Sequence, residues 1–173
     1  MQRSSNLLTA LAFPLFFLCV AAYVWVSSKA MPEVIASHFD AIGLANGWMP
    51  REVYGLFMSG LILVLPLLVV YLPNAIMRRP ANRINLPNRQ YWLAPERREQ
   101  TIARLCRGSV GLGYLLIGFL GYVHYLVVIA NQSKPPTLPS TWFVAGLVVF
   151  VVASLIWGWL YISPFLRVGV RRR

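Results

Sequence analysis

The sequence predicts an all-α integral membrane protein, a bundle of four transmembrane helices with both termini in the cytoplasm. Apolar residues make up 58% of its 173 residues and charged residues only 12%, whereas soluble domains are about 45–50% apolar. The apolar residues gather in four stretches, each about as long as a bilayer's hydrocarbon layer is thick. The basic residues are distributed unevenly between the two sides of these stretches, and this asymmetry predicts the orientation.

The four predicted spans cover 7–26, 53–72, 110–130 and 142–162 and contain no Asp, Glu, Lys or Arg. A helix of about twenty residues crosses a hydrocarbon layer of about 30 Å. The first span is longer than the apolar core of a secretory signal, which is about 7–15 residues, so we expect an uncleaved anchor. Neither the outer loop, 27–52, nor the inner loop, 73–109, is large enough to fold alone, so 1–173 is predicted to be a single membrane domain.

The sixteen Lys and Arg residues predict the orientation of the spans. Thirteen lie on the side of the N-terminus and three on the opposite side, and cytoplasmic loops carry the excess of positive charge in multi-pass proteins. The N-terminal side holds Arg3, Arg78, Arg79, Arg83, Arg89, Arg97, Arg98, Arg104, Arg107, Arg167, Arg171, Arg172 and Arg173; the other side holds Lys29, Arg51 and Lys134. Topology and anionic lipid at the cytoplasmic face therefore account for the net charge of +11, and we expect no nucleic-acid partner.

The third span contains one histidine, His124, beside a row of small residues. Gly113, Ile117, Gly121 and His124 are spaced by four, four and three, so we expect this stripe to pack against another helix. An intramembrane histidine is a candidate proton relay, ligand site or metal site. However, no span contains an acidic residue and haem would need a further axial ligand. We therefore expect a structural hydrogen bond from His124 to a tyrosine or a backbone carbonyl, and no cofactor.

The two cysteines, Cys19 in the first span and Cys106 near the inner edge of the third, lie at different depths. Because a disulfide requires close Cα atoms, we expect both thiols to be free.

The outer loop, 27–52, is rich in turn-forming residues. Asp40 and Gly43 suit the first and fourth positions of a turn, and Asn46-Gly47 suits a second turn with positive φ. Residues 34–39 can form a short extended segment before these turns. The loop is therefore predicted to be an ordered, hydrogen-bonded lid.

A metal site in the same loop is the alternative, because His38, Asp40 and Glu33 carry possible ligand atoms. Structural zinc takes four protein ligands and catalytic zinc usually three. The spacing of these residues matches neither kind of site, so we expect no metal.

Eight residues of the outer loop occur in a characteristic order: Pro32, His38, Phe39, Asp40, Gly43, Ala45, Asn46 and Trp48. With this spacing the loop resembles a family of bacterial membrane proteins defined by a domain of unknown function, whose members include SdpI-like toxin-immunity and signalling proteins. The resemblance covers the loop and its flanking spans and implies an outward-facing loop in a bacterial inner membrane, without catalytic residues. The candidate binding residues are therefore His38, Phe39, Asp40, Gly43, Asn46 and Trp48.

The inner loop, 73–109, is predicted to contain an interfacial helix. Pro95 suits the first position of a helix and Glu96 its first turn, where the helix dipole favours negative charge. This helix is expected to continue to about Arg107 and into the third span. Aromatic residues just before it suit the headgroup level. The residues expected to anchor this loop at the interface, or to dock a cytoplasmic partner or anionic lipid, are Tyr91, Trp92, Glu96, Arg97 and Arg98.

The sequence contains no Ser-His-Asp set, paired carboxylates, phosphate-binding glycine loop or histidine-rich metal motif, so we expect no catalytic residue and no enzyme. We predict a non-enzymatic membrane protein that senses or binds a ligand or protein at the outer face, in a signalling or immunity-like role. The alternative is an accessory subunit of a membrane transporter or other membrane complex. In either case the glycine-lined helix faces could pack on a partner membrane protein or on a second copy of the chain.

Overall fold

The computed structural model describes residues 2–77, 79–80 and 84–167, with the backbone alone described for residues 2–10, 74 and 77. Arg78, Arg83 and Arg171 to Arg173, which the charge count includes, lie outside the described residues. Four long helices, one short helix and one two-stranded sheet follow in the order α1 (Gln2–Lys29), β1 (Val34–Phe39), β2 (Ala45–Pro50), α2 (Arg51–Met77), α3 (Arg89–Trp92), α4 (Pro95–Ala130) and α5 (Ser140–Leu166).

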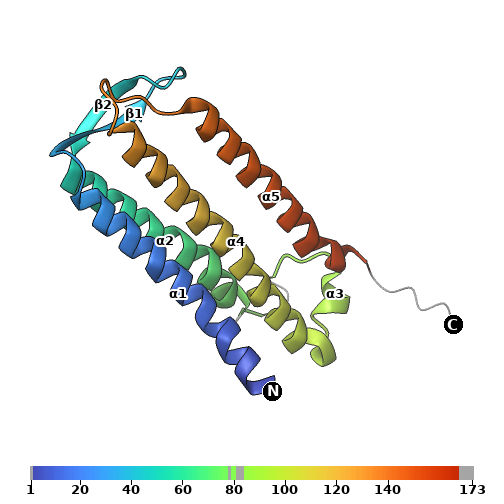
Figure 1. Cartoon of the computed structure of the whole chain (residues 1–173). Helices are drawn as coiled ribbons and strands as arrows, with labels where there is room; N and C mark the ends of the chain where they lie inside the picture. Colours follow the sequence, from blue (N-terminus) through green and yellow to red (C-terminus); the bar gives the residue numbers. More distant parts are fainter. Residues whose placement is uncertain (1, 78, 81–83, 168–173) are drawn as a thin grey trace.

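Four of the helices are long and apolar enough to cross a membrane: Leu11–Lys29, Arg51–Pro73, Pro95–Ala130 and Ser140–Leu166. Each overlaps one predicted span and extends beyond it at one or both ends. The chain is therefore a multi-pass membrane protein. Figure 1 shows the sheet at one end of these helices, and α3, the first turn of α1 and the last turn of α5 at the opposite end.

α4 is one continuous helix of 36 residues that includes both the predicted interfacial helix and the third span. It begins at Pro95, as predicted, with Glu96 in its first turn. Proline is tolerated there because the first amide groups of a helix have no intrahelical acceptor. The basic first turns and the apolar span of α4 are thus parts of a single element.

The chain is mostly helical, as predicted, but the fold is not all-α, because the outer loop is a β-hairpin. β1 and β2 pair antiparallel, with Ile35 opposite Met49 and His38 opposite Gly47, and the register shifts on both sides of His38. The predicted extended segment at 34–39 is β1. The second predicted turn, at Asn46-Gly47, is wrong, because both residues lie within β2.

The packing of the helices is unequal. α1, α2 and α4 pack on one another in all three pairings, whereas α5 packs along α4. Among the described residues, α5 buries only Phe165. The stripe on α4 packs as predicted: a Cβ at Gly113 would lie 2.8 Å from both Phe13 of α1 and Val70 of α2. The absence of a side chain at Gly113 therefore allows three helices to approach closely.

The largest hydrophobic cluster lies directly beneath the hairpin. Ile35 of β1 packs with Val24 of α1, Met58 of α2 and Val127 of α4, all of them buried. The side chain of Ile35 therefore anchors the hairpin in the hydrophobic core between the helices. Both cysteines are free, as expected.

Candidate functional site

The outer hairpin, defined as β1, β2 and the turn between them, is closed by Asp40 and Gly43. The amide of Gly43 donates to the Asp40 carbonyl at 3.0 Å, and the Asp40 carboxylate accepts from the amides of Ile42 at 3.0 Å and Leu44 at 2.9 Å. Gly43 has φ +92°, a conformation that L side chains rarely adopt. The predicted turn at 40–43 is therefore present, and the carboxylate of Asp40 is used to hold it.

A second chain segment, the link between α4 and α5, holds the turn in place. The amide of Leu138 donates to the Gly43 carbonyl at 2.8 Å, and Leu44 forms a β-bridge with Thr137. A Cβ at Gly43 would overlap the Leu138 carbonyl oxygen. Only glycine therefore fits at this crossing of the two segments.

The middle of β1 is held by a side chain of α4's C-terminal cap. Asn131 Oδ1 accepts from the Ala36 amide at 2.8 Å, and Asn131 Nδ2 donates to the Ala36 carbonyl at 2.9 Å. The same Nδ2 donates to the Val127 carbonyl at 2.9 Å. The side-chain amide of Asn131 thus pairs with the edge of β1 as the backbone of a neighbouring strand would.

The candidate binding residues of the outer hairpin divide into two groups. Phe39 is half-buried against the hydrophobic cluster and Gly43 is buried beneath Leu138. The exposed group consists of His38, Asp40, Asn46 and Trp48. Within it, Asp40 is committed to the turn, and His38 lies over Gly47, whose added Cβ would be 3.0 Å from that of His38. Gly47 therefore provides close approach between the strands, not positive φ.

Large apolar side chains of the outer hairpin are also exposed, and Trp48 of this group is one of them. Trp48 is 57% exposed, Ile42 at the turn 73% and Val34 60%. The hairpin itself is held by hydrogen bonds on two sides, so these side chains project from a fixed backbone. These exposed side chains are available for contact with a partner.

The arrangement of the possible metal ligands of the outer hairpin does not bring them together. The Asp40 carboxylate faces its own turn amides, while His38 Nδ1 lies 3.0 Å from the hydroxyl of Ser37. Within the described part of the chain, no three His, Cys, Asp or Glu side chains form a group that could hold a metal ion.

His124 is fully buried, and side chains from two other helices contact its ring nitrogens. Nδ1 lies 2.9 Å from the hydroxyl of Tyr54 on α2, and Nε2 lies 2.7 Å from Ser27 Oγ on α1. Ser27 Oγ also donates to the Tyr23 carbonyl at 2.5 Å. One proton arrangement satisfies every group: Tyr54 donates to Nδ1, Nε2–H donates to Ser27, and Ser27 donates to the carbonyl.

This network joins α1, α2 and α4 through the ring of His124. The expected tyrosine partner is Tyr54, whose ring also stacks on His124 with centroids 5.6 Å apart. The sequence did not reveal Ser27 as a partner, because a serine near the end of an apolar span has no distinguishing local pattern.

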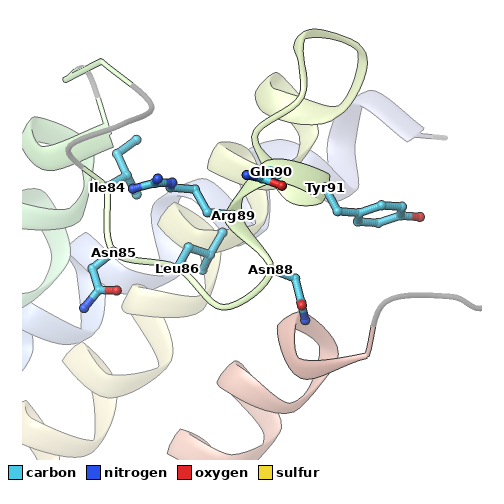
Figure 2. A pocket seen from close by; sticks show the side chains of 7 residues that line it. All are labelled: Ile84, Asn85, Leu86, Asn88, Arg89, Gln90 and Tyr91. Atoms are coloured by element: carbon cyan, nitrogen blue, oxygen red, sulfur yellow. The ribbon is translucent and has the colours of Figure 1, made fainter.

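At the opposite end, the inner segment 84–92 folds back against α5. Figure 2 shows Asn88 pointing toward the last turn of α5, where its Nδ2 donates to the carbonyls of Phe165 at 2.9 Å and Leu166 at 3.2 Å. Trp92 Nε1 donates to the same Phe165 carbonyl at 3.1 Å. These side chains satisfy carbonyls that the end of a helix leaves without partners.

The cavity drawn in Figure 2 lies beside this segment, has a volume of about 500 Å³ and is lined by Ile84, Asn85, Leu86, Asn88, Arg89, Gln90 and Tyr91. Tyr91 points away from the helices in this view. The guanidinium of Arg97 lies 4.1 Å from the Tyr91 ring centroid. Of the other inner-loop candidates, Glu96 is exposed, and Arg98 is half-exposed and donates to the Arg79 carbonyl at 3.1 Å.

A second inner cavity, the basic groove, lies where the first turns of α4 pass the end of α5. It has a volume of about 510 Å³ and is lined by Trp92, Arg97, Glu99, Gln100, Thr101, Ala103, Arg104, Arg107 and Phe165. Three arginines and one carboxylate line this groove, so it is suited to an anionic group.

A family described as a domain of unknown function, DUF1648, matches residues 14–64. The match includes most of α1, the whole outer hairpin and the first half of α2, and covers less than half of the chain. Neither the curated proteins nor the solved structures gave a match. The chain therefore contains a segment similar to a domain of unknown function, and that segment carries the hairpin.

Proposed function

We propose that the chain is a non-enzymatic protein of the bacterial inner membrane whose outer hairpin binds a protein or peptide on the outer side. The observation that carries this proposal is the exposure of Trp48, Ile42 and Val34 on a backbone fixed by Asn131 and Leu138. A surface that is ordered before binding loses less conformational entropy on association. Tryptophan is also among the residues that contribute most to binding at interfaces.

The distribution of charge supports the orientation in this proposal. The hairpin end carries Lys29, Arg51 and Lys134. The arginines of the opposite end whose side chains are described are Arg79, Arg89, Arg97, Arg98, Arg104, Arg107 and Arg167. The more basic end corresponds to the cytoplasm. In this orientation both termini are cytoplasmic and the hairpin lies outside. A signalling or immunity-like role, suggested by the resemblance to SdpI-like proteins, requires an outward-facing surface of this kind.

Two tryptophans allow a matched test of this function. Trp48 is 57% exposed on the hairpin, and Trp159 is 62% exposed on α5. In a strain that lacks the protein, the Trp48→Ala variant should fail to restore the wild-type phenotype although it reaches a normal level in the membrane. The Trp159→Ala variant should restore that phenotype. Full restoration by Trp48→Ala contradicts a binding role for the hairpin. If the Trp48→Ala variant loses function only because less of it reaches the membrane, Trp48 has a folding role, and this result also contradicts the proposal.

We also infer that the basic groove binds anionic lipid at the cytoplasmic face. Arg104 lies with its guanidinium 5.7 Å from the Phe165 ring centroid, and Arg97 and Arg107 line the same groove. Each basic residue near an anionic membrane surface contributes about 1 kcal/mol. Replacing Arg97 and Arg104 with Gln should lower the number of phosphatidylglycerol molecules that copurify with the protein. An unchanged number contradicts this assignment.

An accessory-subunit role is the second candidate function, and the groove between α4 and α5 supports it. This apolar groove has a volume of about 580 Å³, and its lining includes the small residues Gly118 and Ala153. A Cβ at Gly118 would meet nothing within 4 Å. Small residues of this kind allow a further transmembrane helix to approach closely. Mass measurement of the detergent-purified protein tests this role. A monomer without a copurifying protein counts against it, and a defined complex supports it.

A further inference from the structure

A lateral cleft opens between α1 and α2 at the hairpin end of the molecule, separate from the exposed residues of the outer hairpin. Its volume is about 410 Å³, and its lining is Trp25, Ser28, Lys29, Arg51, Glu52, Gly55 and Leu56. These residues belong to the last turns of α1 and the first turns of α2, which run side by side in Figure 1. Because these residues are at the hairpin ends of two candidate spans, we place the cleft near the boundary between hydrocarbon and headgroups.

A hydroxyl without a partner lies in the wall of this cleft. Ser28 is 4% exposed, and its Oγ makes no hydrogen bond with any residue that the structure describes. Burial of a polar group without a partner is unfavourable. The hydroxyls of Ser59 and Ser154 are also unpartnered among the described residues, but neither lines the cleft. Ser28 Oγ is itself buried, so a rotation of its side chain toward the cleft would let this unpartnered hydroxyl donate to an occupant.

Gly55 allows α1 and α2 to approach closely beside that hydroxyl. A Cβ at Gly55 would lie 3.3 Å from Ser28 Cβ and 3.7 Å from Ser28 Oγ. Any side chain at Gly55 would therefore narrow the cleft at the position where Ser28 lines it.

Two cations, Lys29 and Arg51, line the cleft. The ammonium of Lys29 lies 4.5 Å from the Trp25 ring centroid. Arg51 is fixed by a hydrogen bond of 3.0 Å to the Met31 carbonyl and by an ion pair of 3.5 Å with the carboxylate of Glu52. The lining carries one more positive than negative charge, which favours an anionic occupant.

The charged residues and the apolar residues of the cleft lie at different heights along the axes of α1 and α2. Leu56 follows Arg51 by five residues, a rise of about 7.5 Å in a helix, and Trp25 precedes Lys29 by four, about 6 Å. Leu56 is 67% exposed and Trp25 48% exposed, so both present apolar surface toward the bilayer. Cations, a hydroxyl and an apolar surface thus follow one another with increasing depth in the membrane.

We propose that this cleft binds one anionic glycerophospholipid. Its phosphate lies between Lys29 and Arg51, an ester carbonyl accepts from Ser28 Oγ, and one acyl chain lies along Leu56 and Trp25. A phosphate followed by an ester carbonyl and a hydrocarbon chain has the same order of chemistry as the cleft. The site is independent of the proposed hairpin function, because its ligand enters from the membrane.

The test measures lipid binding to the full-length protein by native mass spectrometry, with Arg97 and Arg104 replaced by Gln so that the basic groove is weakened. Dioleoyl phosphatidylglycerol should bind and dioleoyl phosphatidylcholine should bind much more weakly. Lys29→Gln should weaken binding of the anionic lipid about fivefold, and Ser28→Ala should weaken it by about the same factor through the lost hydrogen bond. Lys29→Arg keeps the charge and should retain binding.

Two variants are matched controls for these changes. Lys134→Gln removes an exposed cation from the same end of the molecule, and Ser154→Ala removes an unpartnered buried hydroxyl elsewhere; both should bind like the parent protein. Equal binding of the two lipids, or equal weakening by Lys29→Gln and Lys134→Gln, overturns the proposal. Competition by sn-glycerol 3-phosphate at the lipid's own concentration also overturns it, because the site then recognises a free phosphate without the acyl chain.

Discussion

The side-chain amide of Asn131 hydrogen bonds to both backbone groups of Ala36, accepting from its amide at 2.8 Å and donating to its carbonyl at 2.9 Å. Asn131 caps α4, and Ala36 lies in the middle of β1. This pair of bonds fixes the hairpin on the end of the helix. It turns a two-stranded ribbon, which alone is at best marginally stable, into an ordered surface.

Replacing Asn131 with Leu should release the middle of β1. Both backbone groups of Ala36 lose their partner, and a local loss of about 2 kcal/mol corresponds to roughly thirtyfold faster amide exchange. Hydrogen exchange of the peptide covering β1 measures this effect. Asn46→Leu, at an exposed position of β2, is the control. Unchanged exchange in the Asn131 variant would show that these bonds do not order the hairpin.

Gly43→Ala should destabilise the protein, whereas the same change at Gly60 should not. Gly43 has φ +92°, and an added Cβ would overlap the Leu138 carbonyl; strain of this kind costs about 1–3 kcal/mol. A Cβ at Gly60 meets nothing within 4 Å, and alanine is favoured in helices by about 1 kcal/mol. Thermal unfolding in detergent should therefore shift to lower temperature for Gly43→Ala alone. Equal shifts for the two variants would contradict the role of Gly43.

Removing the Tyr54 hydroxyl should weaken the network that joins α1, α2 and α4. Tyr54→Phe leaves Nδ1 of His124 without its partner, and hydrogen bonds between membrane helices contribute about 1 kcal/mol. Tyr71→Phe is the control, because Tyr71 is 62% exposed on the same helix. The double variant with Tyr54→Phe and His124→Leu should lose less unfolding free energy than the two single variants lose in sum. The reason is that both changes remove the same hydrogen bond between Tyr54 and His124. A strictly additive result would show that the two side chains do not interact.

The orientation should be visible in cysteine labelling of intact cells. With Cys19 and Cys106 replaced by Ala, a cysteine at position 46 should react with a membrane-impermeant maleimide. A cysteine at position 90 should react only after the membrane is permeabilised. Both positions are exposed, so a difference in reactivity reports the side of the membrane. Labelling of position 90 in intact cells, with position 46 labelled only after permeabilisation, would contradict the proposed orientation.

Local chemistry in the sequence predicts much of this architecture. The four spans follow from apolar length, the start of α4 follows from Pro95, and the turn at 40–43 follows from Asp40 and Gly43. The Asn-Gly pair within β2 misled the prediction, because this dipeptide is typical of hairpin turns. Here Gly47 is required for a different reason, the close approach of His38.

The contacts that position the candidate sites could not be predicted in the same way. Asn131 and Ala36 are 95 residues apart, and Asn88 and Phe165 are 77 apart. An asparagine that hydrogen bonds to a distant backbone has the same local sequence as one in an ordinary turn or cap. Such pairs are evident only once the helices have been placed side by side.

Photocrosslinking in living cells tests the central claim, that the outer hairpin is an ordered docking surface, most directly. A photoreactive phenylalanine analogue replaces Ile42 or Trp48 on the hairpin, or Leu155, which is 69% exposed on α5, as the control. We expect the two hairpin positions to form an adduct with the same extracytoplasmic protein or peptide, position 155 to form no such adduct, and Asn131→Leu to reduce the hairpin adducts. Absence of adducts from positions 42 and 48 at a normal membrane level, or the same adducts from position 155, would contradict the claim.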